Sequence, residues 1–369
     1  MSQEKLTYVD FETMERFMAE VLVKSGVPEA DAKICAEVLI TADKLGIDSH
    51  GFNRLKPIYY DRIKDGILNP VTQFEVVRES PATAVVDGHN GMGHVIAKRS
   101  MQIAIDKARM FGMGMVAVRN STHYGIAGYY ALMAAKENMI GITGTNARPS
   151  IAPTFGVENM LGTNPLTFAL PTDEDFPFML DCATSVSQRG KIELYARKGM
   201  ELPKGWVIDE NGESKTNAKE VLSDLIAEKA ALTPLGGVGE ETAGYKGYGY
   251  ATVVEILSAA LQSGSYMKML LGIKDGKKIP YPLGHFFIAI DINAFTNPED
   301  FKHITGDILR ELRASKKMPG QTRIFTAGEK EYYIWLYRKD KGVPVNESLQ
   351  KDIKKLVEEL HITGYDFPF

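Results

Sequence analysis

The stretch MVAVRNSTHYGIAGYYALMAAKENMIGITGTNA, residues 115–147, decides the fold class of this chain. Residues 115–120 are a short apolar run of β type, and residues 126–138 read as a helix that follows the polar turn STHYG. Residues 139–147 are a second run of β type. Because strand, helix and strand in this order make a βαβ unit, the stretch predicts an α/β fold whose sheet contains at least one parallel pair of strands.

A further strand is predicted in FPFMLDCATS, residues 176–185, and it also ends in polar residues. Ligands of open α/β sheets bind at the carboxyl ends of the strands. The polar residues that follow the three strands are Asn120–His123, Asn146 and Asp181–Ser185. We therefore expect a ligand site at this edge of the sheet and assign Asn146 to it.

The sequence before this unit predicts helices, and the sequence after it predicts a mixture of loops, helices and strands. Two N-terminal helices are predicted, one ended by Gly26 with Met14, Phe17, Met18, Val21 and Leu22 on one face, and one from Pro28 to Gly46 with Cys35, Val38, Leu39, Ala42 and Leu45. Residues 197–246 read as loops around one short helix, and residues 250–264 as a buried apolar helix. The C-terminal part predicts a strand at 285–293, a helix at 298–316, a β-rich segment at 322–339 and a solvated last helix at 346–360.

The composition is that of an ordinary globular protein. The chain has 369 residues, with 44% hydrophobic and 24% charged residues, which predicts two or three domains. A net charge of -4 gives no reason to expect a nucleic acid partner. We also expect no membrane span, because no apolar run is long enough, and a cytoplasmic location, because the acidic N-terminus has no signal-like segment.

Several well-known chemistries lack their motifs in this chain. The two cysteines, Cys35 and Cys182, do not form a CxxC pair, so we expect reduced, buried thiols and no metal site. No G-x-G-x-x-G fingerprint occurs, and the turn after the first strand of the βαβ unit is NSTHYG instead. A P-loop, an H-E-x-x-H motif and a G-x-S-x-G elbow are absent too, which argues against NTPases, zinc proteases and α/β-hydrolases.

Two histidines in polar turns are the candidates for proton transfer. His50 lies in DSHGFNRL, residues 48–55, and His123 lies in the NSTHYG turn. A loop histidine beside serine and aspartate can exchange a proton with a substrate oxygen near neutral pH. Arg54 is suited to binding a carboxylate in bidentate fashion. The alternatives from the residues alone are a histidine that packs at a helix end and an arginine in a surface ion pair.

The whole chain resembles the type-2 malate/L-lactate dehydrogenases, a family that includes ureidoglycolate and sulfolactate dehydrogenases. The matching segments follow the family's order: DSHGFNRL, VRNSTHYGIAGYYA, TNARPSIAPTFG, LGTNPLTFALP, LDCATSVSQRGKI, GYKGYGYA and AGEKEY. The resemblance implies a homodimeric, nicotinamide-dependent oxidoreductase with a non-Rossmann cofactor domain and a mixed sheet. It also implies a division into residues 115–281, for the cofactor, and residues 1–114 with 282–369, a helical and α/β part on the substrate side.

The resemblance implies roles for individual residues. His50 looks like the proton donor and acceptor, with Ser49 beside it in a relay, although in some members the histidine of the NSTHYG turn is the base. Substrate contacts fall on Arg54, Thr163 and Arg189. Cofactor contacts fall on Asn120, Ser121, His123, Asp181, Ala183, Lys246, Gly328, Glu329 and Lys330.

Two positions depart from the family's pattern. Ala327 replaces a frequent proline in the late loop, which puts the shape of that loop in doubt. Lys191 stands where imine-reducing relatives carry aspartate in the relay, and this favours the hydroxy-acid members. The expected reaction interconverts a 2-hydroxy acid and a 2-oxo acid with NAD or NADP, NAD being favoured. Malate is the first choice, because Arg54 and Arg189 could bind two carboxylates. Ureidoglycolate, lactate and sulfolactate are the alternatives, and a non-catalytic binding protein is the alternative of another class.

Overall fold

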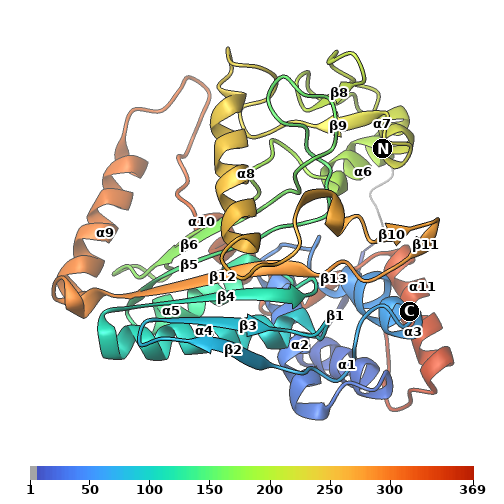
Figure 1. The fold of residues 1–369 in the computed structure, drawn as a ribbon, viewed down its shortest axis with the longest axis horizontal. Coiled ribbons are helices and arrows are strands. Elements are labelled where there is room, and N and C mark those ends of the chain that lie inside the picture. The colour runs from blue at the N-terminus through green and yellow to red at the C-terminus, as the bar shows by residue number, and fades with distance from the viewer. Residues whose placement is uncertain (1–5) are drawn as a thin grey trace.

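A seven-stranded mixed sheet forms the centre of the molecule (Figure 1). A computed structural model describes residues 6–369 of the chain. The strand order is β2-β3-β4-β12-β5-β6-β7. The strands are β2 (Glu75–Glu79), β3 (Thr83–Asp87), β4 (Met113–Ser121), β12 (Leu283–Asp291), β5 (Met139–Thr145), β6 (Leu166–Leu170) and β7 (Phe178–Cys182).

The predicted βαβ unit exists, but its two strands are not neighbours. β12 lies between β4 and β5 and runs antiparallel to both, so β4 and β5 point the same way without being bonded to each other. The parallel pair of the sheet is β3 with β4. Because β7 runs antiparallel to β6, and β6 to β5, the carboxyl ends of β4, β5 and β7 meet at one edge, as the polar strand ends predicted.

Helices cover both faces of the sheet (Figure 1). α4 (Gly93–Phe111) and α5 (Ala127–Lys136) pack on one face through a core of alanine, valine and aromatic side chains. α8 (Gly244–Ala259) packs on the other face against β12, β4 and β5. The prediction that this helix is buried is wrong for one of its sides, because Tyr250, Val253 and Ile256 are exposed.

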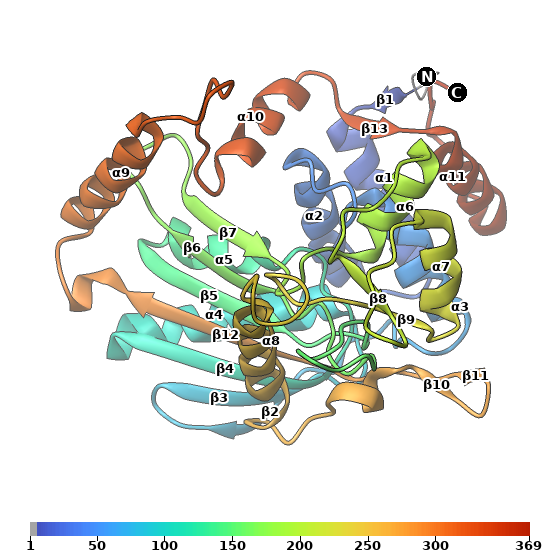
Figure 2. The same ribbon diagram turned by 90° about the horizontal axis from the view of Figure 1, so that it is seen from above.

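The N-terminal helices and the chain's last helix share a separate core. α1 (Phe11–Lys24) and α2 (Glu29–Lys44) bury the predicted apolar stripes, with Leu45 just past the end of α2 only half-buried. They pack with α11 (Glu347–Leu360), which was predicted as a helix with one solvated face. β1 (Thr7–Val9) pairs with β13 (Val343–Val345), which joins the first described strand to the segment before α11 (Figure 2). The segment after α2 continues as η1 (Phe52–Arg54), the π-helical η2 (Leu55–Tyr60) and α3 (Asp61–Lys64).

A small lobe follows β7 and has its own apolar core. It consists of α6 (Arg189–Lys198), β8 (Val207–Asp209), α7 (Ala218–Ile226) and β9 (Ala230–Leu232). The single short helix predicted within residues 197–246 is α7, whereas the β8–β9 pair was not predicted. After α8 come η3 (Met267–Leu270) and a hairpin of β10 (Ile273–Lys274) and β11 (Lys277–Lys278).

The segment after β12 contains one wrong prediction. η4 (Ile292–Ala294) precedes α9 (Pro298–Ala314), which forms where a helix was predicted. The segment predicted as β-rich forms a loop and then α10 (Glu329–Arg338). Tyrosine, isoleucine and tryptophan favour strands, but the helix starts after Gly328 in a left-handed conformation (φ 91°) and packs Trp335 against Phe11.

The sheet joins strands from both sides of the boundaries expected at residues 114 and 282. β2 and β3 precede residue 115 and β12 follows residue 281, yet all three belong to the sheet. Residues 115–281 therefore share one sheet with their flanking segments. The division between cofactor and substrate functions stays a prediction.

Candidate active site

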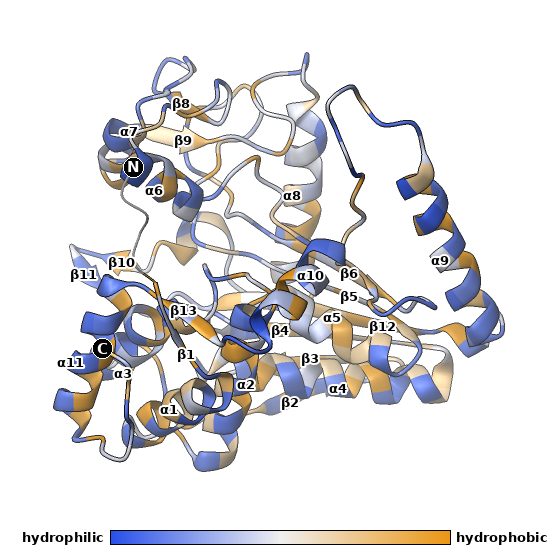
Figure 3. Cartoon of the chain, turned by 180° about the vertical axis from the view of Figure 1, so that it is seen from behind, coloured by the Kyte–Doolittle hydropathy of each residue, from blue (hydrophilic) through white to orange (hydrophobic). Residues whose placement is uncertain are grey.

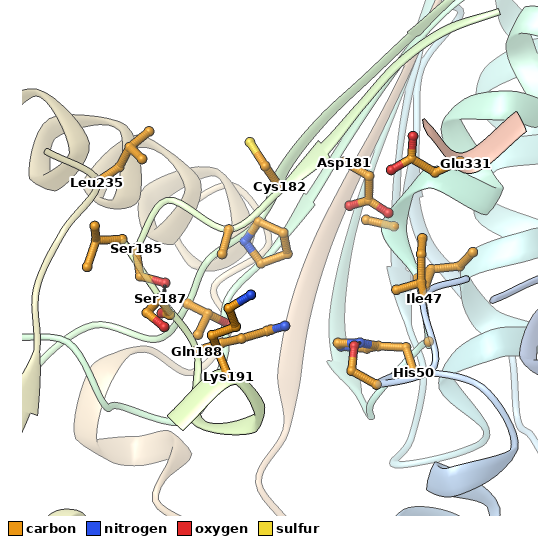
Figure 4. Close-up of a pocket in the computed structure, with 18 of the residues that line it drawn as sticks. Ile47, His50, Asp181, Cys182, Ser185, Ser187, Gln188, Lys191, Leu235 and Glu331 are labelled. Carbon is orange, nitrogen blue, oxygen red and sulfur yellow. Dashed lines mark hydrogen bonds between the residues drawn. The ribbon is translucent and has the colours of Figure 1, made fainter. Parts of the chain in front are cut away.

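A cavity of about 530 Å³ opens at the carboxyl edge of the sheet (Figure 4). Its walls come from the loop after α2, the start of α5, the ends of β6 and β7, α6 and the start of α10. Six of the residues singled out in the sequence line it together: Ser49, His50, Thr163, Asp181, Ala183 and Lys191. Figure 4 shows Lys191 facing His50 across the cavity. Ser49 and His50 lie more than 100 residues before the other four in the chain, so the fold gathers them in one place.

Asp43, near the end of α2, holds the loop that carries Ser49 and His50 in place. The buried Asp43 carboxyl accepts a hydrogen bond of 2.8 Å from the backbone N–H of Phe52. Burial raises the pKa of Asp43 to about 8. Gly51 packs so closely on this carboxyl that an added Cβ would lie 1.9 Å from Oδ1. Only glycine therefore fits at this point of the loop.

Two arginines hold the same loop, Arg338 from outside it and Arg54 from within it. Arg338 of α10 donates to the Asp43 carbonyl at 2.7 Å and pairs with the Asp48 carboxylate at 2.5 Å. Arg54 donates from Nε to the Ser49 carbonyl at 2.5 Å. The loop is therefore held at its start, middle and end before any substrate arrives.

His50 is held as a neutral imidazole at the cavity. Its Nδ1 lies 2.9 Å from the Ser49 hydroxyl. Burial, with a smaller contribution from the Arg54 charge, lowers the pKa of His50 to about 4. The imidazole is therefore neutral at pH 7 and can act as a base.

His123 lies beside His50, in contact with a tyrosine that the sequence did not single out. The two imidazole rings stack with centroids 5.7 Å apart at an angle of 16°. The Tyr59 hydroxyl lies 2.6 Å from Nδ1 of His123, and the Tyr59 ring packs on the fully buried His94 at 4.6 Å. No local pattern could reveal the pair, because 64 residues separate its members.

Two arginines next to these histidines lack an acidic partner. Arg54 and Arg62 are half-buried, and neither forms an ion pair with a carboxylate of residues 6–369. Arg62 lies over the Tyr281 ring at 4.5 Å instead. Burial lowers the pKa of both guanidinium groups. Positive charge that the protein leaves uncompensated in a half-buried position favours an anionic ligand.

Ser187, Gln188 and Lys191 form the wall opposite His50, and Arg189 lies next to it. Arg189 starts α6 and pairs with Glu193 at 3.0 Å, and its half-exposed side chain does not line the cavity. Ser187 does line the cavity, and its buried hydroxyl has no hydrogen-bond partner within the described chain. Such a hydroxyl fits a polar ligand group.

Asp181 and Cys182 end β7 at the cavity. The Asp181 carboxyl accepts from the N–H of Gly128 at 2.7 Å and from the Thr167 hydroxyl at 3.0 Å, which joins the start of α5 to the sheet. Burial raises the pKa of Asp181. Cys35 is buried as predicted, but the same prediction is wrong for Cys182, which is only half-buried and lines the cavity.

Three residues assigned to cofactor binding lie away from the cavity lining. Asn120 donates from Nδ2 to both oxygens of Asp87 at 2.9 and 3.0 Å. Ser121 is fully buried. Asn146 is also buried, donating to the Ser265 carbonyl and accepting from the N–H of Gly284. In the structure these residues fix the ends of β4 and β5.

The late loop lies next to a second cavity of about 420 Å³. Gly328 and Glu331 line it, and Glu331 lines the first cavity as well, so the two are neighbours. Glu329 is almost completely buried, where it pairs with Arg323 and accepts from the N–H of Thr326. Lys330 and, on α8, Lys246 are exposed, and neither lines the first cavity.

Neither a candidate membrane span nor a candidate metal cluster is found in the described residues. No helix among residues 6–369 is long and apolar enough to cross a membrane. The same part of the chain contains no group of three or more histidine, cysteine or acidic side chains that could bind a metal ion.

Comparison with known proteins gives one consistent result. A family model described as malate/L-lactate dehydrogenase matches residues 9–354. A malate dehydrogenase of Pyrococcus abyssi is 45% identical over 95% of this chain and 94% of its own length. An L-sulfolactate dehydrogenase of Methanocaldococcus jannaschii is 38% identical over 96% and 98%. The crystal structure of malate dehydrogenase from Entamoeba histolytica superposes with a TM-score of 0.94 at 43% identity, over 99% of this chain and 100% of that one.

Proposed function

This chain belongs to the malate/L-lactate dehydrogenase family, and on that premise we propose that it interconverts malate and oxaloacetate. Membership makes it a 2-hydroxy-acid dehydrogenase that uses a nicotinamide cofactor. The observation that carries the proposal is the single cavity in which His50, Ser49, Thr163 and Lys191 meet beside the uncompensated charge of Arg54.

The two neighbouring cavities fit an elongated cofactor. Asp181, Ala183 and the unpartnered Ser187 hydroxyl would contact its reactive end, and Gly328 would lie at the second cavity. When bound, the nicotinamide accepts the hydride from C2 of the hydroxy acid or returns it to the oxo acid. The exposed side chains of Lys246 and Lys330 would approach the phosphates of the cofactor. The remaining assigned residues would support the segments that form the site without lining the cavity: Asn120, Ser121, Asn146 and Glu329.

His50 would manage the proton. In the oxidation direction the neutral imidazole takes the hydroxyl proton of the substrate, and in reduction it returns that proton. Ser49, in hydrogen-bond contact with Nδ1, and Lys191, which faces His50 across the cavity, form the remaining part of the relay. His123 in the neighbouring turn is the alternative proton carrier.

Two arginines and a threonine would bind the substrate. Arg54 would bind the carboxylate next to the reacting carbon, and Thr163 would contact the same end. Arg189 would leave its ion pair with Glu193 and bind the second carboxylate of malate instead. The extra charge of Arg62 also favours a doubly negative substrate over lactate.

We further propose a homodimer that works in the cytoplasm and uses NAD rather than NADP. Self-association is supported by exposed apolar side chains along one side of α9, namely Ile304, Ile308 and Leu312. Figure 3 shows bands of hydrophobic colour along this helix. Two free cysteines suit a reducing compartment. Light scattering of the purified protein would give the oligomeric state.

Sulfolactate, lactate and ureidoglycolate are the alternative substrates, and the L-sulfolactate dehydrogenase relative gives the first of them direct support. Initial rates with all four acids, each with NAD and with NADP, test the proposal. We expect the highest kcat/KM with malate and NAD. A higher value with another acid would replace malate. Failure to bind either cofactor, measured by fluorescence, would instead favour a non-catalytic binding protein.

A further inference from the structure

We propose that Tyr59 fixes His123 as a hydrogen-bond donor toward the reacting oxygen of the substrate, so that His123 polarises this oxygen while His50 carries the proton. This inference rests on the proposed hydroxy-acid dehydrogenase function and assigns separate roles to two histidines. It makes His123 a catalytic residue and Tyr59 its positioning residue.

The hydrogen bonds at Nδ1 of His123 decide which ring nitrogen carries the proton. The Tyr59 hydroxyl lies 2.6 Å from Nδ1, and the backbone N–H of Gly125 points to the same atom at 3.4 Å. The N–H can only donate, so Nδ1 presents its lone pair to both partners. The proton of a neutral His123 must therefore lie on Nε2.

The surroundings keep both members of the pair neutral. Burial is the main reason why the pKa of His123 lies well below its usual value. The charges of the neighbouring His50, His94, Arg54 and Arg62 lower it further. Burial likewise raises the pKa of the Tyr59 phenol well above its usual value. A phenol that keeps its proton is a permanent donor toward Nδ1.

A histidine in this state can donate from Nε2 but has no lone pair there to accept a proton. It could pass the Nε2 proton to a substrate oxygen only if Tyr59 gave its own proton to Nδ1. That transfer would leave a phenolate on a fully buried side chain, which burial disfavours. His123 is therefore suited to stabilise charge on the oxygen rather than to act as general acid or base.

The reaction balances with one proton carrier. During oxidation the hydroxyl proton passes to His50, the hydride leaves C2 for the nicotinamide, and the C–O bond becomes C=O. The Nε2–H of His123 donates to the same oxygen throughout and stabilises the negative charge that develops as the proton leaves. His50 lines the cavity, and the His123 ring lies 5.7 Å from the His50 ring, which places His123 next to a substrate bound against His50.

Paired substitutions separate the donor role from the proton-carrier role. The amide of glutamine can replace an Nε2–H donor but cannot carry a proton. We expect His123→Gln to stay within about 10-fold of the normal kcat and His123→Ala to lose about 100-fold. We expect His50→Gln and His50→Ala to lose about 1,000-fold alike. Equal losses in the two His123 variants, both folded and binding cofactor, would overturn the proposal.

A spectroscopic measurement tests the role of Tyr59 without relying on turnover. In protein with ¹⁵N-labelled histidine, we expect His123, assigned by comparison with His123→Gln, to show a protonated Nε2 and an unprotonated Nδ1. In Tyr59→Phe we expect this preference to weaken and kcat to fall about 10-fold with KM little changed. Tyr60→Phe is the matched control, because the Tyr60 hydroxyl bonds to Glu359 at 2.5 Å instead.

The outcomes separate this proposal from the proposed function. A normal protein that oxidises none of the four acids would overturn the function, and the tautomer would still be read from the spectrum. An enzyme that oxidises malate but holds the proton of His123 on Nδ1, or is unaffected by Tyr59→Phe, would overturn the positioning role of Tyr59.

Discussion

The two walls of the cavity are built in opposite ways. The loop of residues 47–54 is tied to the protein by Asp43 and Arg338, and a hydrogen bond from Arg54 to Ser49 fixes it internally. Across the cavity, Ile192 is the buried side chain of α6, and Arg189 is joined only to a neighbour on its own helix. One wall has its geometry before substrate binds, whereas the other presents exposed charges that can still rearrange.

The difference indicates a division of labour. Proton transfer needs donor and acceptor at fixed distances, and the loop wall provides them. Substrate selection needs charges that can be redirected, and Arg189 and Lys191 of α6 fit that need. Substitutions in the loop wall should therefore act on turnover and stability, and those in α6 on substrate affinity.

The largest expected effect concerns His50, at the centre of the loop wall. We expect His50→Ala to lower kcat for malate by about 1,000-fold while the affinity for cofactor, measured by fluorescence titration, stays within about two-fold. His303→Ala, on the surface beside Asp173, is the control and should leave both values unchanged. Near-normal turnover of His50→Ala would remove this residue from the mechanism.

Acid should destabilise the protein through its buried histidines. Burial lowers the pKa of His94 and His285 to about 3 and that of His50 to about 4. Below pH 6.5 these histidines take up protons in the unfolded chain but stay neutral in the folded chain. Each of them therefore lowers the free energy of unfolding by about 2 kcal/mol between pH 7 and pH 5.

Asp43 acts in the opposite direction. Because its pKa is raised to about 8, the folded state binds a proton more readily at Asp43 than the unfolded state does. As the pH falls from 7 to 5, this stabilises the folded state by about as much as one of the histidines destabilises it. Urea unfolding at pH 7 and pH 5 measures the net loss. Equal free energies at the two pH values would show that the histidines are not buried as neutral groups.

Asp43 itself tests whether the loop wall is held by a hydrogen bond or by a charge. With its raised pKa, Asp43 is mostly protonated at pH 7, and Asp43→Asn keeps an oxygen for the Phe52 N–H. We expect Asp43→Asn to be mild, and Asp43→Ala to cost about 1–3 kcal/mol in unfolding free energy and to lower kcat. Thermal unfolding and rate measurements compare the two, and equal damage by both would mean that a carboxylate is required.

The smallest effects should come from α6. We expect Arg189→Ala to raise KM for malate by about 10-fold, with a melting temperature close to normal. Lys198→Ala, at the far end of the helix, is the control. A loss of stability comparable to that of Asp43→Ala would contradict the contrast between the walls.

The sequence predicted the parts of the fold that local patterns determine. α1, α2, α9 and α11 appear where apolar residues recur at helical spacing and capping residues begin or end the run. The insertion of β12 between β4 and β5 could not be predicted, because strand order depends on pairing between residues 140 positions apart. α10 was mispredicted because packing of Trp335 outweighed the strand preference of its residues.

The site was predictable to a similar extent. The DSHGFNRL segment and the strand ends identified Ser49, His50 and Asp181, and the family resemblance added Thr163 and Lys191. All five line one cavity. Tyr59, Arg62 and Asp43 were missed, since their importance comes from what they contact or lack, and these contacts are not local. Chemistry-bearing loops leave a signal in the sequence, whereas the residues that tune them emerge only from the fold.

The most direct test of the central claim is a crystal structure with NAD and tartronate, a dicarboxylate whose hydroxyl matches that of malate. We expect this hydroxyl within about 3 Å of the rings of both His50 and His123, with one carboxylate on Arg54. A tartronate bound in the second cavity, or with its hydroxyl away from both histidines, would contradict that claim.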